Sequence, residues 1–461
     1  MDFNQTTPYD TLLEKWSPVV DHPDMPKIDD IHRRRCTAVL LENQKRAMNE
    51  QAGVLNEVST NNIGTGFGTS NTAAPGALAG YDPILISLVR RAMPNIVAYD
   101  VAAVQPMTAP TGLIFAMKAN YDSKSGQEAF FDEPVSQAGV SAGATTSASG
   151  YSSGGSDGAS GASVTPINAD GTRVDNMTAW RGMLTGTGEA LGADSGFKEM
   201  GFSIERVAVN AKTRALKAEY TTELAQDLRA VHGLDAESEL ANILSVEILN
   251  EINREVLRTV YTTAVTGARQ SDLANQGGVY DLNLDSDGRW SAERFRGLMF
   301  QIEREANSIA KATRRGKGNF IITSADVASA LAMGGFLNLS PALNVNLNAD
   351  DTGNIFAGIL NNKMKVFIDP FATAGVDFAC VGYKGASPYD AGIFYCPYVP
   401  LQMVRAVGQD TFQPKIGFKT RYGMAQNPFA KGRGAISSDL EAGVNQYYRI
   451  FRVTNIHGNG I

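Results

Sequence analysis

The four histidines are the first residues to test for acid–base or metal chemistry. His22, His32, His232 and His457 show no HxxxH or HExxH spacing, the pattern that places two ligands on one helix face. A histidine without such a partner is most often a surface or helix-capping residue, so we expect that role for each. The pattern predicts no histidine base and no metal site.

A serine nucleophile would stand in a GxSxG turn between a strand and a helix. Two overlapping matches, Gly150–Gly154 and Gly154–Gly158, fall in residues 136–163, where 24 of 28 residues are Ser, Gly, Ala or Thr. Such a composition produces the motif by chance. We therefore predict no nucleophile there. The stretch has too little apolar area to offset its ordering entropy by itself, so we expect a mobile loop tip or one ordered only by a neighbour.

The sequence also lacks the residue spacing of a phosphate-binding loop and of a catalytic pair of carboxylates. Gly64-Thr65-Gly66 and Gly186-Thr187-Gly188 do not complete GxGxxG, and Arg314–Gly318 has a Gly-Lys pair without the upstream glycine of a phosphate loop. A basic surface turn is expected at residues 314–318. Glu303 and Glu305 fall in a helical pattern and are interpreted as solvent-facing charge. The sequence predicts no enzyme and no cofactor.

Composition narrows the class further. The chain has 461 residues, 43% of them hydrophobic, with a net charge of −7, which disfavours a sequence-specific grip on nucleic acid. Cys36, Cys380 and Cys396 are odd in number and lack CxxC spacing, so neither a disulfide framework nor a zinc ribbon is expected. No apolar run is long enough to span a membrane and the N-terminus has no secretory signal, which indicates folding in a cytosol.

The element that must position the rest is a long helix over Asp235–Thr266. A broad apolar face is predicted from two lines of residues: Leu240, Leu244, Ile248, Ile252, Val256 and Val260, and beside them Ile243, Val246, Leu249 and Leu257. Asp235 is the expected N-cap and Gly267 the expected stop. At 1.5 Å per residue this helix is roughly 45 Å long, so other elements must lie across it.

Residues 1–57 form a separate, charged segment with a helix expected from about Asp29 to Gln51. Arg33, Arg34 and Arg35 form a basic cluster, interpreted as a solvated helix face; the alternative is a docking helix for an acidic partner. After Glu57 the composition changes to a glycine-rich stretch without periodicity, which predicts an extended arm.

The rest of the chain alternates strand-like and helical runs. Short strands are expected around Ile96–Tyr99 and Leu113–Met117, an alternating strand follows Phe202, and Trp290–Ala312 reads as a second amphipathic helix. NFIITS, MKVFIDP, FACVGYKG, AGIFYCPYVP and YYRIFRVTNI then predict a mixed sheet with helices beside it. The fold class is α+β.

Several blocks resemble a known family. RRAMPNIVAYD at residues 90–100, then ELAQDLRAVHGLDAESEL, DAGIFYCPYV and FQPKIGFKTRYG, are similar to the major capsid protein of T-even-like tailed bacteriophages. The resemblance follows the family's order over nearly the whole chain except about residues 123–198, which are shorter and richer in small residues than the family's inserted domain.

This resemblance implies an HK97-type phage capsid fold with a long spine helix, peripheral and axial domains, an N-terminal arm and an E-loop. The implied parts, in order, are a propeptide (1–57) removed on head maturation, the N-arm (58–100), an E-loop region (101–215) with its low-complexity tip (123–198), the spine helix and peripheral domain (216–320), the axial domain (321–430) and a return strand to the peripheral domain (431–461).

The resemblance also implies a structural subunit of the virion head shell, synthesised and assembled in the host cytoplasm as hexameric capsomers. Implied partners are further copies of the chain, a vertex capsid protein, an internal scaffold protein, a prohead protease, a folding chaperonin and decoration proteins. Two alternatives remain: the related vertex protein, which shares the fold, and a cytosolic enzyme with glycine-rich loops.

The implied prohead protease prefers an apolar residue, any residue and then glutamate. Leu55-Asn56-Glu57 fits where the helical composition gives way to the arm, so cleavage is expected after Glu57, leaving Val58 at the new N-terminus. Leu40–Glu42 and Leu249–Glu251 also fit but lie inside expected helices, where folding protects them.

Overall fold

The computed structural model describes residues 8–23, 27–57, 89–90, 93–121, 129, 189, 200–268, 277–286, 288, 290–335, 337–338, 355–373, 375–408, 412–431 and 440–456. The chain divides into two compact units, Met1–Ile114 with Val207–Ile461, and Phe115–Arg206. Residues 58–88 of the arm expected at 58–100 lie outside the described residues, and so do both GxSxG matches, both GxG pairs and His457. The low-complexity tip also lies outside them, apart from Ala129 and Glu189.

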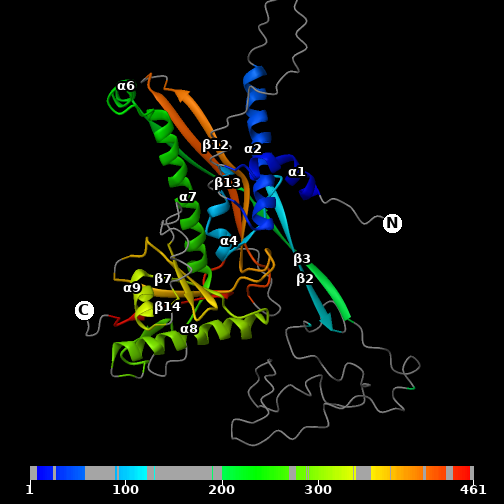
Figure 1. Cartoon of the computed structure of the whole chain (residues 1–461). Coiled ribbons are helices and arrows are strands. Elements are labelled where there is room, and N and C mark those ends of the chain that lie inside the picture. Colours follow the sequence, from blue (N-terminus) through cyan, green and yellow to red (C-terminus); the bar gives the residue numbers. More distant parts are fainter. Residues whose placement is uncertain are drawn as a thin grey trace, which may run out of the picture. The chain divides into compact units, whose positions relative to one another are not determined.

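The long helix is α7, Ala236–Thr263 (Figure 1). Leu244, Ile248, Ile252, Val256 and Val260 are buried along one stripe, as predicted, and so are Leu249 and Leu257 of the second line. Asp235 is the N-cap residue, although its side chain makes no capping hydrogen bond.

Two expectations for α7 are wrong. Ile243 is 64% exposed and Val246 is also exposed, so the buried face in the first half of α7 is narrower than predicted. The helix ends at Thr263, before Gly267, because the chain continues directly into β5 (Ala264–Thr266), which pairs with β14 (Asn445–Thr454).

The larger sheet has eight strands among the described residues, in the order β5-β14-β11-β7-β10-β9-β8, with β6 also beside β14. The remaining bounds are β6 Val279–Asp281, β7 Phe320–Thr323, β8 Leu337–Asn338, β9 Ile355–Leu360, β10 Met364–Ile368 and β11 Asp377–Gly382. β10 and β7 run parallel while β11 pairs antiparallel with both β7 and β14, so the mixed sheet is confirmed.

Helices cover both faces of this sheet. Phe320 and Ile322 of β7 lie in the same apolar cluster as the buried stripe of α7. Ile321, between them, belongs to a second cluster with α8 (Ser291–Thr313) and α9 (Ala325–Met333). Because successive strand residues face opposite sides, α7 covers one face and α8 with α9 the other.

A second sheet has the strand order β1-β12-β13-β4, with bounds Ala103–Val104, Ile393–Val407, Pro414–Gln426 and Lys212–Glu219. The strand expected around Ile96–Tyr99 is wrong: the chain forms the turn η1 (Met93–Asn95) and the short helix α4 (Ala98–Val101). Residues 96–99 are all buried, and a short fully buried run has no periodicity that separates a strand from a helix.

The N-terminal residues form α1 (Pro8–Val20) and α2 (Ile31–Glu57), which pack against each other, and α2 also lies against β12 (Figure 1). α2 therefore continues beyond the Gln51 end expected from the sequence. Among the described residues, none of the helices is both long and apolar enough to cross a bilayer.

Two elements expose their apolar side chains. β2 (Thr111–Tyr121) and β3 (Met200–Asn210) pair as a two-stranded ribbon, in which exposed large apolar residues alternate with less exposed ones. The exposed set is Leu113, Phe115, Met117, Met200, Phe202 and Ile204. α6 (Thr222–Val231), which packs on α7, has no buried residue.

Candidate functional site

The candidate site is the surface on which α1 and α2, here called the N-terminal segment, dock onto the rest of the first unit. Cys36–Leu41 of α2 are all buried to within 2% exposure. Six consecutive residues of a helix point to all of its sides, so other elements must surround α2 here. α1 covers α2 through Trp16 and Val20, and β12 and η1 contact it from the rest of the unit.

A polar cluster closes α1 onto α2. Lys15 Nζ lies 2.6 Å from Glu42 Oε2, and Trp16 Nε1 donates a hydrogen bond of 2.9 Å to the same oxygen. Burial opposes ionisation of Glu42, but the hydrogen bonds from Lys15 and Trp16 outweigh it and lower the pKa of this carboxyl group. The two helices therefore form one unit.

The basic cluster of α2 is paired within the chain. Arg34 lies 2.6 Å from Asp21 and Arg35 lies 2.9 Å from Asp10, so both bind acids around α1. The structure corrects both interpretations of this cluster. It is neither a purely solvated face nor a site waiting for an external acidic partner, because its partners lie in the segment itself or, for Arg33, in the surface beneath.

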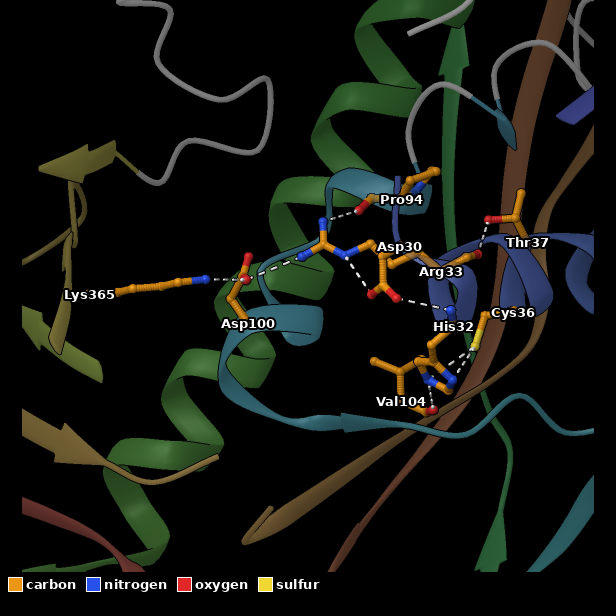
Figure 2. Close-up of polar contacts among 9 residues, drawn as sticks. All are labelled: Asp30, His32, Arg33, Cys36, Thr37, Pro94, Asp100, Val104 and Lys365. Carbon is orange, nitrogen blue, oxygen red and sulfur yellow. Dashed lines mark hydrogen bonds and ion pairs between the residues drawn. The ribbon is translucent and has the colours of Figure 1, made fainter. Parts of the chain in front are cut away.

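Arg33 and His32 tie α2 to the residues around α4 (Figure 2). Arg33 donates to the carbonyl oxygen of Pro94 at 3.1 Å and to Asp100 at 3.2 Å. His32 Nε2 lies 3.0 Å from the carbonyl oxygen of Val104, and burial lowers the pKa of the ring. His32 is thus a half-buried contact residue, which corrects the surface or capping role expected for it, whereas His232 is the C-cap of α6, as expected.

Two further anchors were not found from the sequence. Asn43 is buried and donates through Nδ2 to the carbonyl oxygens of Met107 and Tyr398, at 2.7 and 2.9 Å. Arg90, 1% exposed, donates through Nε and one terminal nitrogen to the carbonyl oxygen of Val20, at 3.0 and 2.6 Å. The sequence offered little to predict them: Asn43 is a single polar residue after the apolar run of α2, and Arg90 begins a block that resembles the family.

The contacts of this site hold the N-terminal segment against the rest of the first unit. The described residues of the site show no arrangement of side chains for a reaction. Among the described residues, no group of three or more His, Cys, Asp or Glu side chains is placed to hold a metal. Cys36, Cys380 and Cys396 are free and buried, as expected without a disulfide framework, and burial raises the pKa of Cys36 to about 12, so its thiol stays protonated at neutral pH.

The carboxylates expected to face solvent on α8 do not. Glu305 is buried and accepts hydrogen bonds from Ala268 N and Gln301 Nε2, both at 2.8 Å, while Arg449 lies 3.2 Å away. Glu303 is half-buried and pairs with Lys317. The helical period turns Glu305 toward the larger sheet, and the sequence analysis did not predict this. The groups bound to Glu305, from Ala268, Gln301 and Arg449, hold α8 in place.

The three matches named above for the cleavage pattern occupy different environments. Leu40-Leu41-Glu42 lies within α2, with both leucines buried, and Leu249-Asn250-Glu251 lies within α7, with Leu249 buried. Leu55-Asn56-Glu57 forms the C-terminal end of α2, and Val58 lies outside the described residues. The last turn of a helix frays most easily, so only this match combines the pattern with easy local opening.

These features define a class: a structural subunit with a long helix packed against two sheets, a two-stranded ribbon with exposed apolar side chains, and a docked N-terminal segment. The chain belongs to the family of the major capsid protein Gp23, whose model matches residues 78–453. It is 38% identical over 430 residues to the major capsid protein of Serratia phage KSP90, covering 91% of this chain and 90% of that protein. It is 35% identical to the major capsid protein of Enterobacteria phage T4, covering 96% and 98%.

The capsid vertex protein of Enterobacteria phage T4 is also similar, at 29% identity over 51% of this chain and 55% of that protein. Among solved structures, the capsid of Myoviridae phage XM1 is similar with a TM-score of 0.37 and 10% identity, covering 76% of this chain and 89% of that one. Mycobacterium phage Bobi gives a TM-score of 0.36 and 8% identity, covering 78% and 89%.

Family membership confirms three expectations from the sequence. The chain is a capsid protein of the head shell, it is a structural subunit and not an enzyme, and it has an α+β fold. The alternative of a cytosolic enzyme with glycine-rich loops is overturned.

Proposed function

We propose that this chain forms the hexameric capsomers of an icosahedral or elongated phage head that encloses double-stranded DNA. The coverage of the relatives supports the hexamer position over the vertex position: the major capsid protein of T4 matches over 96% of the chain, and the vertex protein over 51%. The vertex position remains the alternative, in which five copies surround a fivefold axis.

The observation that carries this proposal is the uncovered apolar face of the ribbon. Phe115 and Met117 of β2 and Met200, Phe202 and Ile204 of β3 are each more than half exposed. Covering these apolar side chains with a partner would stabilise the assembly, because removing apolar surface from water is favourable. Exposed apolar patches of this kind mark interaction sites. A neighbouring subunit covers this face in the shell.

Maturation would then remove residues 1–57 by cleavage after Glu57, with Val58 as the new N-terminus. The segment contains 7 Lys and Arg against 10 Asp and Glu, so its loss changes the net charge of the chain from −7 to −4. A nearly neutral shell neither repels its own subunits strongly nor binds packaged DNA tightly. The internal scaffold, prohead protease, vertex protein, chaperonin and decoration proteins implied by the resemblance belong to this proposal.

Assembly tests the ribbon. Phe115→Asp with Phe202→Asp should abolish shells of the full-length chain, measured by sedimentation and negative-stain imaging, since a charge on each strand disfavours a desolvated contact. Leu284→Asp, at a similarly exposed apolar residue in a turn, is the matched control and should assemble. Shells from the double variant, in wild-type yield, would overturn the proposal.

Intact mass of subunits from finished particles tests the cleavage. The wild type should lose the mass of residues 1–57, while Glu57→Gln should retain it and Glu50→Gln, in the same helix, should not. A new N-terminus elsewhere than Val58 would contradict the assigned site without affecting the assembly proposal.

A further inference from the structure

The helix α6 is well formed but leaves its apolar side uncovered. Its N-cap Thr221 accepts a hydrogen bond of 3.2 Å from the backbone N–H of Leu224. Leu224, Leu228 and Val231 recur at i, i+4 and i+7, so they share one face. Val231 is 74% exposed and no residue of α6 is buried. Most helices in proteins are stabilised by packing of their apolar face, and α7, on which α6 packs, still leaves Leu224 50% and Val231 74% exposed.

The acidic residues beside the apolar face of α6 indicate what kind of surface would bind it. Glu223 and Asp227, four residues apart, line one edge of the apolar face, and neither has an ion-pair partner among the described residues. A complementary partner therefore presents an apolar centre with cations beside it.

The outer face of α8 has that chemistry. Phe300 is 68% exposed, and Arg296 and Arg304 stand four residues before and after it on the same side of the helix. Lys311 continues the stripe. Within the part of the chain that the structure describes, none of these three cations has a carboxylate partner.

This face is also hollowed. A cavity of about 550 Å³ is lined by Phe300, Arg304, Ser308 and Lys311 of α8 and by Arg449 of β14. Glu303 and Glu305 also line it, and each is already paired, with Lys317 and Arg449 respectively. Arg449 Nε is buried and has no hydrogen-bond partner among the described residues, although another nitrogen of its guanidinium binds Glu305. A hollow of this size accommodates apolar side chains from one face of a helix, with donors available at its rim.

The two surfaces lie at opposite ends of α7 and so do not meet within one copy. α6 precedes the N-terminus of α7 (Figure 1). α8 is held near its C-terminal end, where Ala268 N donates to Glu305 at 2.8 Å. The 28 residues of α7 span about 42 Å at 1.5 Å per residue.

We propose that α6 of one copy docks on the outer face of α8 of the next copy. The inference rests on the proposed function and deepens it by naming one contact of the assembly. Because the two surfaces differ, the contact is head-to-tail, which closes a ring when the rotation between copies is right and otherwise continues as a filament.

Charge reversal on each face tests this contact with full-length protein. Arg296→Glu with Arg304→Glu, and separately Glu223→Lys with Asp227→Lys, should each raise the concentration needed for assembly at least tenfold, measured by sedimentation. The chain with all four changes should assemble at a concentration near that of the wild type. Lys363→Glu, at an exposed lysine outside both faces, is the control and should not change assembly.

A cross-link provides the second measurement. Asp227→Cys combined with Arg304→Cys should give disulfide-linked dimers and higher ladders on oxidation, whereas the native cysteines are buried. If the wild type forms shells while neither reversal changes assembly and no ladder appears, the contact is wrong and the proposed function stands. If each reversal blocks assembly but the combined chain does not recover, the two faces bind different partners and the contact is again wrong. A wild type that forms no shells overturns both.

Discussion

Two helices of nearly equal length, α2 with 27 residues and α7 with 28, are both buried in the first unit, but their polar ties differ. α7 is tied by charged side chains. The side chain of Asp369 is fully buried and binds Arg254 at 2.5 Å and Tyr261 Oη at 3.0 Å. Arg214 and Tyr422 both donate to Glu255 of α7. Removal of α7 would leave the Asp369 carboxylate without Arg254 and Tyr261, and the Arg214 guanidinium without Glu255.

α2 is tied to the surface beneath it mostly through backbone carbonyl oxygens. Arg33, His32 and Asn43 contribute the donors. When α2 leaves, these donors leave with it, and the carbonyl groups left on the opened surface turn to water at little cost. The comparison teaches that the polar ties of the N-terminal segment cost less to break than those of α7, which is consistent with the proposed removal of residues 1–57.

Asp369→Ala gives the largest expected effect. Removing one partner of a buried ion pair leaves Arg254 uncompensated and costs about 3–5 kcal/mol. Equilibrium urea unfolding of the full-length chain measures this loss, with Glu247→Ala, at an exposed position of α7, as the control. A loss below about 1 kcal/mol would show that the charged ties of α7 cost no more to break than those of the N-terminal segment.

Arg90→Met is expected to loosen the N-terminal segment. Arg90 lies outside the N-terminal segment, and two of its nitrogens donate to the carbonyl oxygen of Val20, the last residue of α1. Loss of such charge-assisted hydrogen bonds costs about 1.5–3 kcal/mol. Hydrogen exchange of the amides of α1 and α2 should therefore speed up by more than tenfold, while that of α7 stays unchanged.

Arg229→Met, at an exposed position of α6, is the matched control for this variant. If exchange speeds up equally in α7 and in the segment, Arg90 stabilises the whole unit, and the distinction between the segment and α7 fails at this residue.

Much of this architecture follows from periodicity, and the rest depends on tertiary contacts. The buried stripe of α7 and, to within one residue at each end, the helix α8 are predicted because long amphipathic patterns are unambiguous. The helical turns at residues 93–101 were mistaken for a strand because a fully buried short run has no period. The docking ties escaped prediction because most of them end on backbone carbonyls, and every residue has one.

Asn43→Ala is expected to have an intermediate effect. The change removes hydrogen bonds to two carbonyl oxygens, those of Met107 and Tyr398, at a buried position, which costs about 1–2 kcal/mol. Protease sensitivity of the full-length chain within α2 should rise several-fold, whereas Asn242→Ala, at an exposed position of α7, should leave it unchanged. Equal sensitivity of the Asn43 variant and the wild type would show that apolar packing alone holds α2.

The smallest expected effect is a pH dependence at Lys384. Burial lowers the pKa of its amine to about 8 from the ordinary 10.5; Asp100 raises it, Arg33 and Lys365 lower it further, and Asp30 raises it slightly. Arg33 and Asp30 belong to the docked segment. Between pH 8 and 10.5 the folded chain binds fewer protons at Lys384 than the unfolded chain, so the free energy of unfolding rises with pH across this window. Below pH 8 the amine is charged in both states, and its burial lowers the free energy of unfolding by the full amount.

Urea unfolding of the full-length chain at pH 7.5 and 9.5 measures this dependence. Relative to the wild type, Lys384→Met should flatten the rise, because the buried amine that must lose its proton is gone, while Lys363→Met, at an exposed lysine, should keep it. A chain that begins at Val58 should show a smaller rise than the full-length chain, since opening the docking surface returns water to Lys384 and moves its pKa back toward 10.5. An identical rise in both chains would mean that the segment does not shield this amine, and that the surface beneath α2 is closed by the rest of the first unit alone.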